Sequence, residues 1–316
     1  MKPLLELVPN AKYPLRLVEA DLCKPETWPS AVHRCTYVLH VASPFVIGGN
    51  EAELIHTAVE GTVNVLQACA DAGGIKRVVV TSSCAAISSG SLGNPGNPPD
   101  YVYTEKDWSD EAMCTGYIKS KLKAEQAVWD FAKKLDESKR FELVVVNPAY
   151  VQGPLLSASS GEGSQEFCLR LLNNSLPALP DFSFAVVDVC DVAAAHIAAM
   201  ENSSANGKRH ILSNRSVHLK EFSEIIGNEF RPQGYKITSR DLPKVVLWVG
   251  KFFSATMKAI YHSLGKNLQF RNECMVSELG IQSRPVEESI IDTCYSLIDH
   301  GIAKKTPGYL GHPSKR

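Results

Sequence analysis

The chain has 316 residues, of which 44% are hydrophobic and 21% are charged, and its formal net charge at pH 7 is -1. This is the composition of an ordinary soluble globular protein with one large α/β domain or two smaller ones, and the charge gives no electrostatic reason to expect a nucleic acid or an anionic membrane as partner. The nine cysteines include no C-x-x-C pair, which indicates reduced thiols in a cytoplasmic protein and argues against a disulfide framework or a zinc site.

The first part of the chain predicts short elements. Residues 2–8 look like the end of a helix that stops at Pro9, and residues 15–19 alternate between apolar and polar side chains as a β-strand does. A short helix is expected to begin near Pro25. Residues 36–42 are mostly apolar, as expected of a buried parallel strand.

Longer elements follow. Residues 51–73 carry apolar side chains at helical spacing and end at a Gly-Gly pair, so they predict a long helix. Residues 76–81 and 141–147 are rich in valine and predict two further buried strands. Between them, residues 89–100 have the composition of a loop and residues 111–136 predict a second long helix.

Strands that alternate with helices predict an α/β fold with a Rossmann-like, doubly wound parallel sheet and right-handed crossovers. In such a sheet, ligands bind at the carboxyl ends of the strands. Polar side chains stand at the ends of four predicted strands, namely Asp21, Ser43, Ser83 and Asn147.

The pattern is looser after Pro154, where strands are expected at residues 184–189 and 209–213 and a helix at residues 191–200. We assign the nucleotide-binding domain to residues 1–153 and 184–215, and a smaller C-terminal substrate lobe to residues 154–183 and 216–316. Four aromatic residues are candidates for the substrate pocket, although we expect them to belong to the core instead: Phe167, Trp248, Phe252 and Phe253.

The second long helix is expected to carry Tyr117 and Lys121 one turn apart on the same face. A lysine cation at this distance favours the phenolate, so we expect the pKa of Tyr117 to be lowered toward neutrality, which suits acid–base catalysis. Ser83 closes the run Thr81-Ser82-Ser83 after a strand and is expected to point at the same place. A Y-x-x-x-K match alone is weak, because both residues are common on helix surfaces.

Taken in order, the motifs resemble those of the extended short-chain dehydrogenases/reductases. They are Asp21-Leu22, His40-Val41-Ala42-Ser43-Pro44, Gly61-Thr62-Val63-Asn64-Val65-Leu66, Thr81-Ser82-Ser83, Tyr117-x-x-x-Lys121, and Asn147-Pro148 through Gly153-Pro154. The Val-Ala-Ser-Pro segment is most similar to the dihydroflavonol 4-reductase-like branch of the NAD-dependent epimerase/dehydratase family, with anthocyanidin and cinnamoyl-CoA reductases as relatives. The resemblance covers almost the whole chain.

The resemblance implies catalytic roles for three residues. Tyr117 would protonate the substrate carbonyl oxygen, Ser83 would hydrogen-bond to that oxygen, and Lys121 would hold the ribose hydroxyls of the cofactor. NADPH is the cofactor that the branch implies, with NAD left open, and no metal is expected. The remaining implied cofactor contacts are Asp21 and Leu22 at the adenine, Ala42 and Ser43 at the ribose or phosphate, and Pro148 and Val151 at the nicotinamide.

Several of these residues have a structural alternative. Asp21 also fits a helix cap before Cys23, and Ser43 also fits a turn before Pro44. Four residues are interpreted as structural only: His40 as a strand-end histidine with a local partner, Asn64 as a helix residue, and Asp188 and Asp191 as caps, with Asp191 opening a helix.

The start of the chain departs from the family pattern. The family opens with a strand, a turn of the form G-x-x-G-x-x-G and a helix that together bind the pyrophosphate, and we find no such unit here. We therefore expect an N-terminally incomplete sheet that lacks the first β-α-β unit and the residues that select NADP over NAD. A late-start isoform or an incomplete gene model is favoured over a pseudoenzyme, or over other segments filling the gap.

The leading hypothesis is an NAD(P)H-dependent oxidoreductase that acts on a carbonyl or CH-OH group of a small hydrophobic molecule. The alternative is a truncated, non-catalytic chain that binds partners, including longer copies of itself, through exposed sheet edges. Sugar-nucleotide epimerases and hydroxysteroid dehydrogenases share the same three catalytic residues, but the Val-Ala-Ser-Pro segment argues against them.

Overall fold

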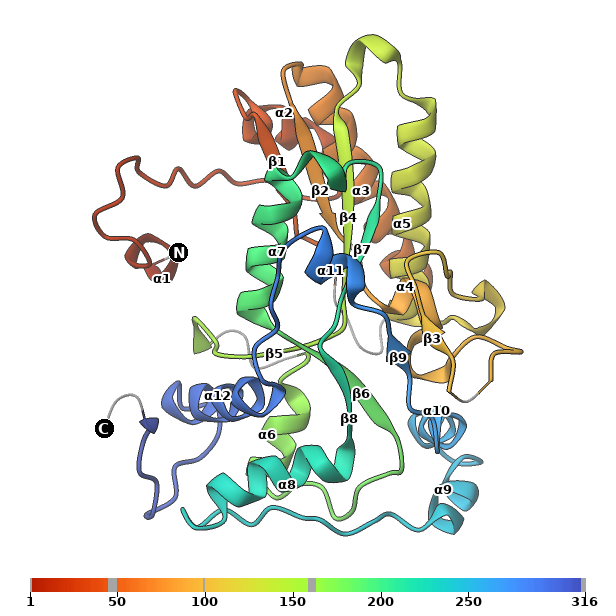
Figure 1. Ribbon diagram of the computed structural model, residues 1–316, viewed down its shortest axis with the longest axis vertical. Coiled ribbons are helices and arrows are strands. Elements are labelled where there is room, and N and C mark those ends of the chain that lie inside the picture. The colour runs from red at the N-terminus through yellow and green to blue at the C-terminus, as the bar shows by residue number, and fades with distance from the viewer. Residues whose placement is uncertain (1, 45–49, 99, 159–162, 314–316) are drawn as a thin grey trace.

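A four-stranded parallel sheet forms the centre of the molecule (Figure 1). The computed structural model describes residues 2–44, 50–98, 100–158 and 163–313. The strands lie in the order β1-β2-β4-β7, and each neighbouring pair is parallel. Their bounds are β1 (Tyr37–His40), β2 (Arg77–Thr81), β4 (Glu142–Pro148) and β7 (Arg209–Leu212). The prediction of a Rossmann-like parallel sheet is confirmed.

Helices cover both faces of this sheet (Figure 1). Helices α3 (Glu51–Ala72) and α5 (Gly116–Lys134) pack on one face, and α7 (Val189–Glu201) packs on the other. Successive side chains of a strand point to opposite faces, so the valine run of β2 supplies both cores. Val78 and Val80 face α3 and α5, whereas Val79 faces α7.

The ends of α3 follow directly from its sequence. The side chain of Asn50 caps the helix by accepting a hydrogen bond from the backbone N–H of Ala52 at 3.0 Å. At the other end, Gly73 adopts φ +63°, which a glycine reaches without steric cost and which stops the helix. The prediction of a helix over residues 51–73 is confirmed to within one residue.

A second, mixed sheet contains β5 (Tyr150–Gln152), β6 (Ser183–Asp188) and β8 (Arg215–His218). It packs against α6 (Glu166–Leu172), α8 (Leu219–Phe230) and α12 (Val286–Asp299) in a core of its own. Ala149 alone separates β4 from β5, and two residues separate β7 from β8. Two chain segments therefore pass directly from the first sheet to the second.

The other elements are short. Strands β3 (Val102–Tyr103) and β9 (Gln269–Phe270) pair in parallel. The remaining helices are α1 (Lys2–Glu6), α2 (Trp28–Val32), α4 (Ala85–Ser88), α9 (Lys244–Gly250), α10 (Ala255–Ser263) and α11 (Glu273–Ser277), with 3-10 turns that include η1 (Pro25–Thr27), η2 (Gly90–Leu92) and η3 (Glu111–Met113). Within the described ranges, no helix combines the length and the apolar character needed to cross a bilayer.

Two predicted elements differ from the structure. The strand predicted at residues 15–19 is wrong: Leu15 and Leu17 are exposed, and this segment joins no β-ladder of the described chain. Alternating apolar and polar side chains give a segment one apolar face, but a strand also needs a neighbouring strand for its backbone hydrogen bonds. The second long helix begins at Gly116 and not at residue 111, because the extended backbone of Cys114 and Thr115 separates it from η3.

Candidate active site

Ser83, Tyr117 and Lys121 lie together beyond the carboxyl end of β2. Ser83 follows that strand, and the backbone N–H of Cys84 donates to the Pro148 carbonyl at 2.9 Å, which keeps this segment beside β4. Tyr117 is in the first turn of α5, and Lys121 is one turn further along the same helix. The structure therefore brings the three predicted catalytic residues to the edge of the sheet where ligands bind in such folds.

The two serines after Thr81 point to different places. The Ser82 hydroxyl is buried and donates to the Glu125 carboxylate at 2.5 Å. The Ser83 side chain accepts from the backbone N–H of Ala85 at 3.1 Å and hydrogen-bonds with Tyr117. This geometry supports Ser83, and not Ser82, as the serine available to a substrate.

The expected lowering of the Tyr117 pKa is wrong for the protein alone. Burial raises the pKa of Tyr117, and the hydrogen bond with Ser83 opposes this rise only in part. The Lys121 ammonium lies 5.8 Å from the centre of the Tyr117 ring and donates to the Thr81 carbonyl at 3.3 Å. Because desolvation outweighs any cation at this distance, Tyr117 is a neutral phenol at physiological pH, which is the form that can donate a proton.

Lys121 and His40 are both buried near the site, and the charge of Lys121 acts on His40. Burial lowers the pKa of Lys121 to about 8, against the opposing attraction of Glu125. His40, the last residue of β1, has its pKa lowered to about 4, first by burial and then by the charge of Lys121. The interpretation of His40 as structural only misses this position beside the site, which its place at the carboxyl end of a strand indicates.

The depressed pKa of His40 predicts a loss of stability in acid. A histidine titrates near pH 6.5 in the unfolded chain but near pH 4 when folded, so the unfolded state binds the extra proton between these values. Stability is therefore full above about pH 6.5 and decreases by about 3 kcal/mol as the pH falls to about 4. His40→Gln should remove this part of the acid loss, as measured by urea unfolding across that range.

The matched control for this test is His56→Gln, since His56 is exposed on α3. His196 and His210 have their pKa lowered by burial too, so some acid loss remains in every variant. An unchanged acid dependence in His40→Gln would show that His40 does not contribute.

Four of the residues predicted to contact the cofactor lie on strands or just after them. Pro148 ends β4 and its carbonyl holds Cys84, and Val151 lies on β5 against the core that contains α7. Ala42 and Ser43 are the second and third residues after the end of β1, on the same edge of the sheet as Ser83. The glycine-containing loop that continues from Ser43, residues 45–49, lies outside the described residues.

Asp21 and Leu22 do not follow a strand, because the predicted strand before them does not form. The Asp21 carboxylate accepts from the backbone N–H of Cys23 at 2.9 Å, so it stabilises a local turn. Leu22 packs closely on α3, where a Cβ added to Gly61 would lie 2.8 Å from the Leu22 Cβ. Asn64 donates to the Leu22 carbonyl at 2.9 Å, which confirms its structural role.

A buried polar network behind the site was not predicted. Glu125 of α5 pairs with Arg209, the first residue of β7, at 2.5 Å, and accepts from the side chain of Asn147 at 2.7 Å. Asn147 also donates to the Ser83 carbonyl at 3.2 Å. Asn147, predicted to face a ligand, thus fixes the backbone of the site instead.

The caps of α7 also differ in part from the prediction. Asp188 is the N-cap and accepts from the backbone N–H of Cys190 at 2.7 Å. Asp191 does not open the helix: it accepts from the backbone N–H of Arg284 at 2.9 Å, so it joins α7 to the segment before α12.

The spacing G-x-x-G-x-x-G does occur once in the chain, at Gly90, Gly93 and Gly96. These glycines lie in η2 and the loop after it, between α4 and β3, and all three have positive φ. A pyrophosphate-binding turn joins a strand to the N-terminus of a helix. This loop follows a helix instead, so the match is one of spacing alone.

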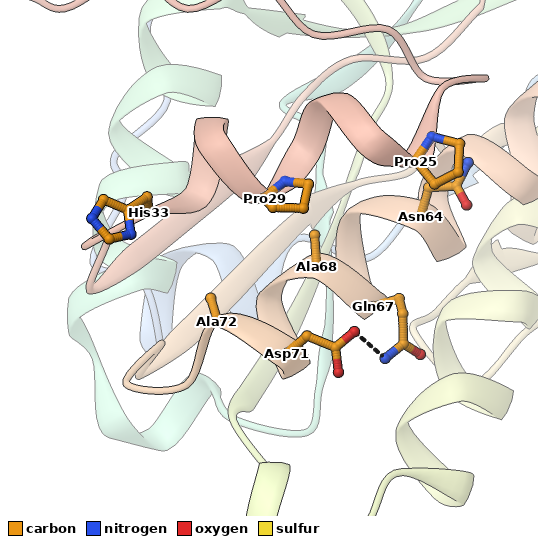
Figure 2. A pocket seen from close by; sticks show the side chains of 8 residues that line it. All are labelled: Pro25, Pro29, His33, Asn64, Gln67, Ala68, Asp71 and Ala72. Atoms are coloured by element: carbon orange, nitrogen blue, oxygen red, sulfur yellow. Dashed lines mark hydrogen bonds between the residues drawn. The ribbon is translucent and has the colours of Figure 1, made fainter.

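A pocket of ≈350 Å³ lies between α2 and α3 (Figure 2). Its lining includes Gln67 and Asp71, whose side chains hydrogen-bond to each other at 2.8 Å. The other lining residues are Pro25, Pro29, His33, Asn64, Ala68 and Ala72. None of the predicted catalytic residues lines this pocket, so it is separate from the candidate active site.

The parallel sheet with helices on both faces defines a Rossmann-like α/β protein, and the groups at its carboxyl edge can donate a proton and hold hydroxyls. The chain belongs to the NAD dependent epimerase/dehydratase family, whose model matches residues 5–213. The resemblance inferred from the ordered motifs is thereby confirmed.

Cinnamoyl-CoA reductase CAD2 of Medicago truncatula is 40% identical over 223 residues, which are 69% of this chain and 65% of that protein, so this match spans slightly less than two thirds of the relative. Cinnamoyl-CoA reductase 1 of Petunia hybrida is 32% identical over 296 residues, covering 92% of this chain and 79% of that protein. The structure of Gre2 from Candida albicans in complex with NADPH matches with a TM-score of 0.74 and 29% identity, covering 95% of this chain and 88% of that one.

Proposed function

We propose that the chain is an NADPH-dependent reductase of a carbonyl group on a small hydrophobic molecule, with alcohol oxidation as the reverse reaction. The observation that carries this proposal is the convergence of Ser83, Tyr117 and Lys121 at the carboxyl edge of the sheet. Membership of the family supports it, as do the reductase names of the relatives and the NADPH complex of Gre2.

The groups at this edge have the chemistry that the cofactor and substrate require. The buried ammonium of Lys121 is a donor suited to the two hydroxyls of a ribose, and the hydroxyls of Ser83 and Tyr117 are donors suited to a carbonyl oxygen. NADPH, when bound, supplies the hydride that the carbonyl carbon accepts.

The residues of the chain have separate roles in the proposed reaction. Ser83 hydrogen-bonds to the carbonyl oxygen and orients the substrate. Tyr117, held neutral by burial, donates its proton to that oxygen as the carbon accepts the hydride, so the carbonyl becomes an alcohol. The Lys121 cation stabilises the phenolate that remains. Ser43 and Pro148 are proposed to flank the cofactor, with Ala42, Val151, Asp21 and Leu22 as further contacts.

We propose that the substrate lobe comprises residues 154–183 and 216–316. Phe167, on α6, packs edge-on against Phe184 and Phe222, so it supports the wall of that lobe. The nine cysteines are all free thiols in the structure, which supports a cytoplasmic location.

Cofactor binding and turnover test this proposal separately. Titration calorimetry should show that the 316-residue chain binds NADPH in preference to NADH. Loss of NADPH absorbance on a panel of aromatic and aliphatic aldehydes and ketones should then identify the carbonyl class. A chain that binds neither nucleotide at millimolar concentration contradicts the proposal.

The edge strand β1 favours one second function, that of a non-catalytic chain that associates through this edge. Tyr37 and Leu39 of β1 are exposed on the face that α7 covers elsewhere. An exposed apolar edge strand favours pairing with another chain. A chain that binds no NADPH and forms dimers that Leu39→Lys disrupts, as measured by light scattering after gel filtration, would establish this function instead.

A further inference from the structure

Helices α9 and α10 present an exposed apolar surface at the periphery of the molecule (Figure 1). Phe253 is 85% exposed, Phe252 is 68% exposed and Trp248 is 51% exposed. We call this surface the aromatic patch, and its members are Val245, Val246, Trp248, Val249, Phe252, Phe253 and Met257. The expectation that Trp248, Phe252 and Phe253 belong to the core is wrong.

The aromatic patch is exposed because α9 is attached to the rest of the protein by little of its surface. Leu247 is the buried residue of this helix, while the side chains on either side of it in sequence face solvent. Scattered apolar residues on a surface are normal, but contiguous aromatic and branched side chains mark an interaction site.

The charge around the patch is positive. The segment from residue 242 to residue 268 contains no Asp or Glu, and its four lysines are Lys244, Lys251, Lys258 and Lys266. Lys244 pairs with Asp181 at 3.3 Å, so Lys251 and Lys258 carry the positive charge next to the patch. The Lys251 ammonium lies 4.1 Å from the centre of the Tyr261 ring and 5.2 Å from that of Phe252, so it borders the aromatic side chains. The near-zero net charge of the chain therefore conceals a local basic and aromatic surface.

We propose that the aromatic patch docks on the surface of a bilayer that contains anionic lipids. Tryptophan and phenylalanine side chains are suited to the boundary between headgroups and acyl chains, and lysines next to them attract anionic headgroups. The docked protein lies on the membrane and does not span it. This departs from our expectation from net charge that no membrane is a partner.

Charge complementarity favours a lipid surface over a second copy of the chain. In a symmetric dimer, the same patch would face itself, so the lysines of one copy would meet those of the other. Like charges placed opposite each other oppose association, whereas an anionic surface attracts both Lys251 and Lys258.

The patch is also connected to the candidate active site. Helix α10 packs against η2, where the Lys266 ammonium donates to the Leu92 carbonyl. A Cβ added to Gly90 of η2 would overlap the side chain of Ile118, the residue after Tyr117. Docking would thus place the segment that borders Tyr117 close to the membrane surface.

Vesicle flotation with the full chain, without substrate or cofactor, tests the proposal. We expect binding to vesicles of phosphatidylcholine with phosphatidylserine, weaker binding to phosphatidylcholine alone, and a decrease of the difference as salt is raised. Phe252→Ser combined with Phe253→Ser should lower the partition coefficient at least tenfold. Lys251→Gln combined with Lys258→Gln should remove most of the preference for phosphatidylserine.

The matched control is Ile197→Ser, which removes an apolar side chain 51% exposed on α7, away from the patch. It should bind vesicles like the unmodified chain, and circular dichroism should show that all variants are folded. Failure of the unmodified chain to bind either vesicle, or equal binding by the double phenylalanine variant, overturns the proposal. Dimers in buffer that this variant abolishes, with no vesicle binding, would assign the patch to a second copy.

Discussion

Tyr117→Phe is expected to abolish reductase turnover while leaving NADPH binding in place. The change removes the one hydroxyl that we propose as the proton donor, and it keeps the ring that packs in the first turn of α5. Positioned acid–base groups contribute roughly 10²- to 10⁴-fold to rate, so kcat should decrease by about that factor. Steady-state kinetics on the best carbonyl of the panel, together with NADPH calorimetry, provide the measurement.

Tyr37→Phe is the matched control for this experiment. Tyr37 is also a tyrosine, but it lies exposed at the start of β1. It should have the kcat of the unmodified chain. Turnover by Tyr117→Phe at the unmodified rate would show that another group supplies the proton, and the proposed mechanism would then be wrong.

The second large effect is on stability, at the buried pair of Glu125 and Arg209. Glu125 has no exposed side-chain surface, and its carboxylate accepts from Arg209 at 2.5 Å and from Ser82 and Asn147. Glu125→Ala would leave the guanidinium buried without its counter-charge. Loss of one partner of a buried pair costs about 3–5 kcal/mol, and we expect a decrease of that size in the free energy of unfolding, measured with urea.

Two comparisons show whether this effect comes from the buried charge. Combining Glu125→Leu with Arg209→Met removes both charges and should recover most of the lost stability. Asp71→Ala breaks the exposed pair between Asp71 and Lys139 and should change stability little. If Glu125→Ala were no more destabilising than Asp71→Ala, the buried pair would not hold the site together.

Much of the first sheet could be predicted because its residues carry a local signal. The valines of β2 and β4 are β-branched and buried on both faces, and the helix over residues 51–73 has an asparagine cap, an apolar face and a glycine end. Residues 15–19 carry the same alternation as a strand, but pairing depends on a neighbour that the local sequence does not specify.

In the candidate site, too, contacts between distant parts of the chain could not be predicted from local sequence. The spacing of Tyr117 and Lys121 correctly placed them on one helix, but the balance between burial and charge that sets the Tyr117 pKa arises only in the folded chain. Arg209 and Glu125 are 84 residues apart in sequence, so nothing local predicts their contact. Trp248 of α9, and Phe252 and Phe253 just after it, are placed in the core by the sequence because hydrophobicity alone does not tell a buried face from an exposed one.

The direct passage of β4 into β5 has a mechanical consequence. Ala149 is the single residue between the two strands. Strand β4, whose Pro148 carbonyl accepts a hydrogen bond from the Cys84 N–H, therefore continues at once into the second sheet. A one-residue connection is too short to act as a hinge. A rotation of the second sheet would therefore displace β4 and, with it, the segment that carries Ser83. The two sheets should therefore move as one stiff body during turnover, and any opening for substrate should come from the loops and short helices around the edge.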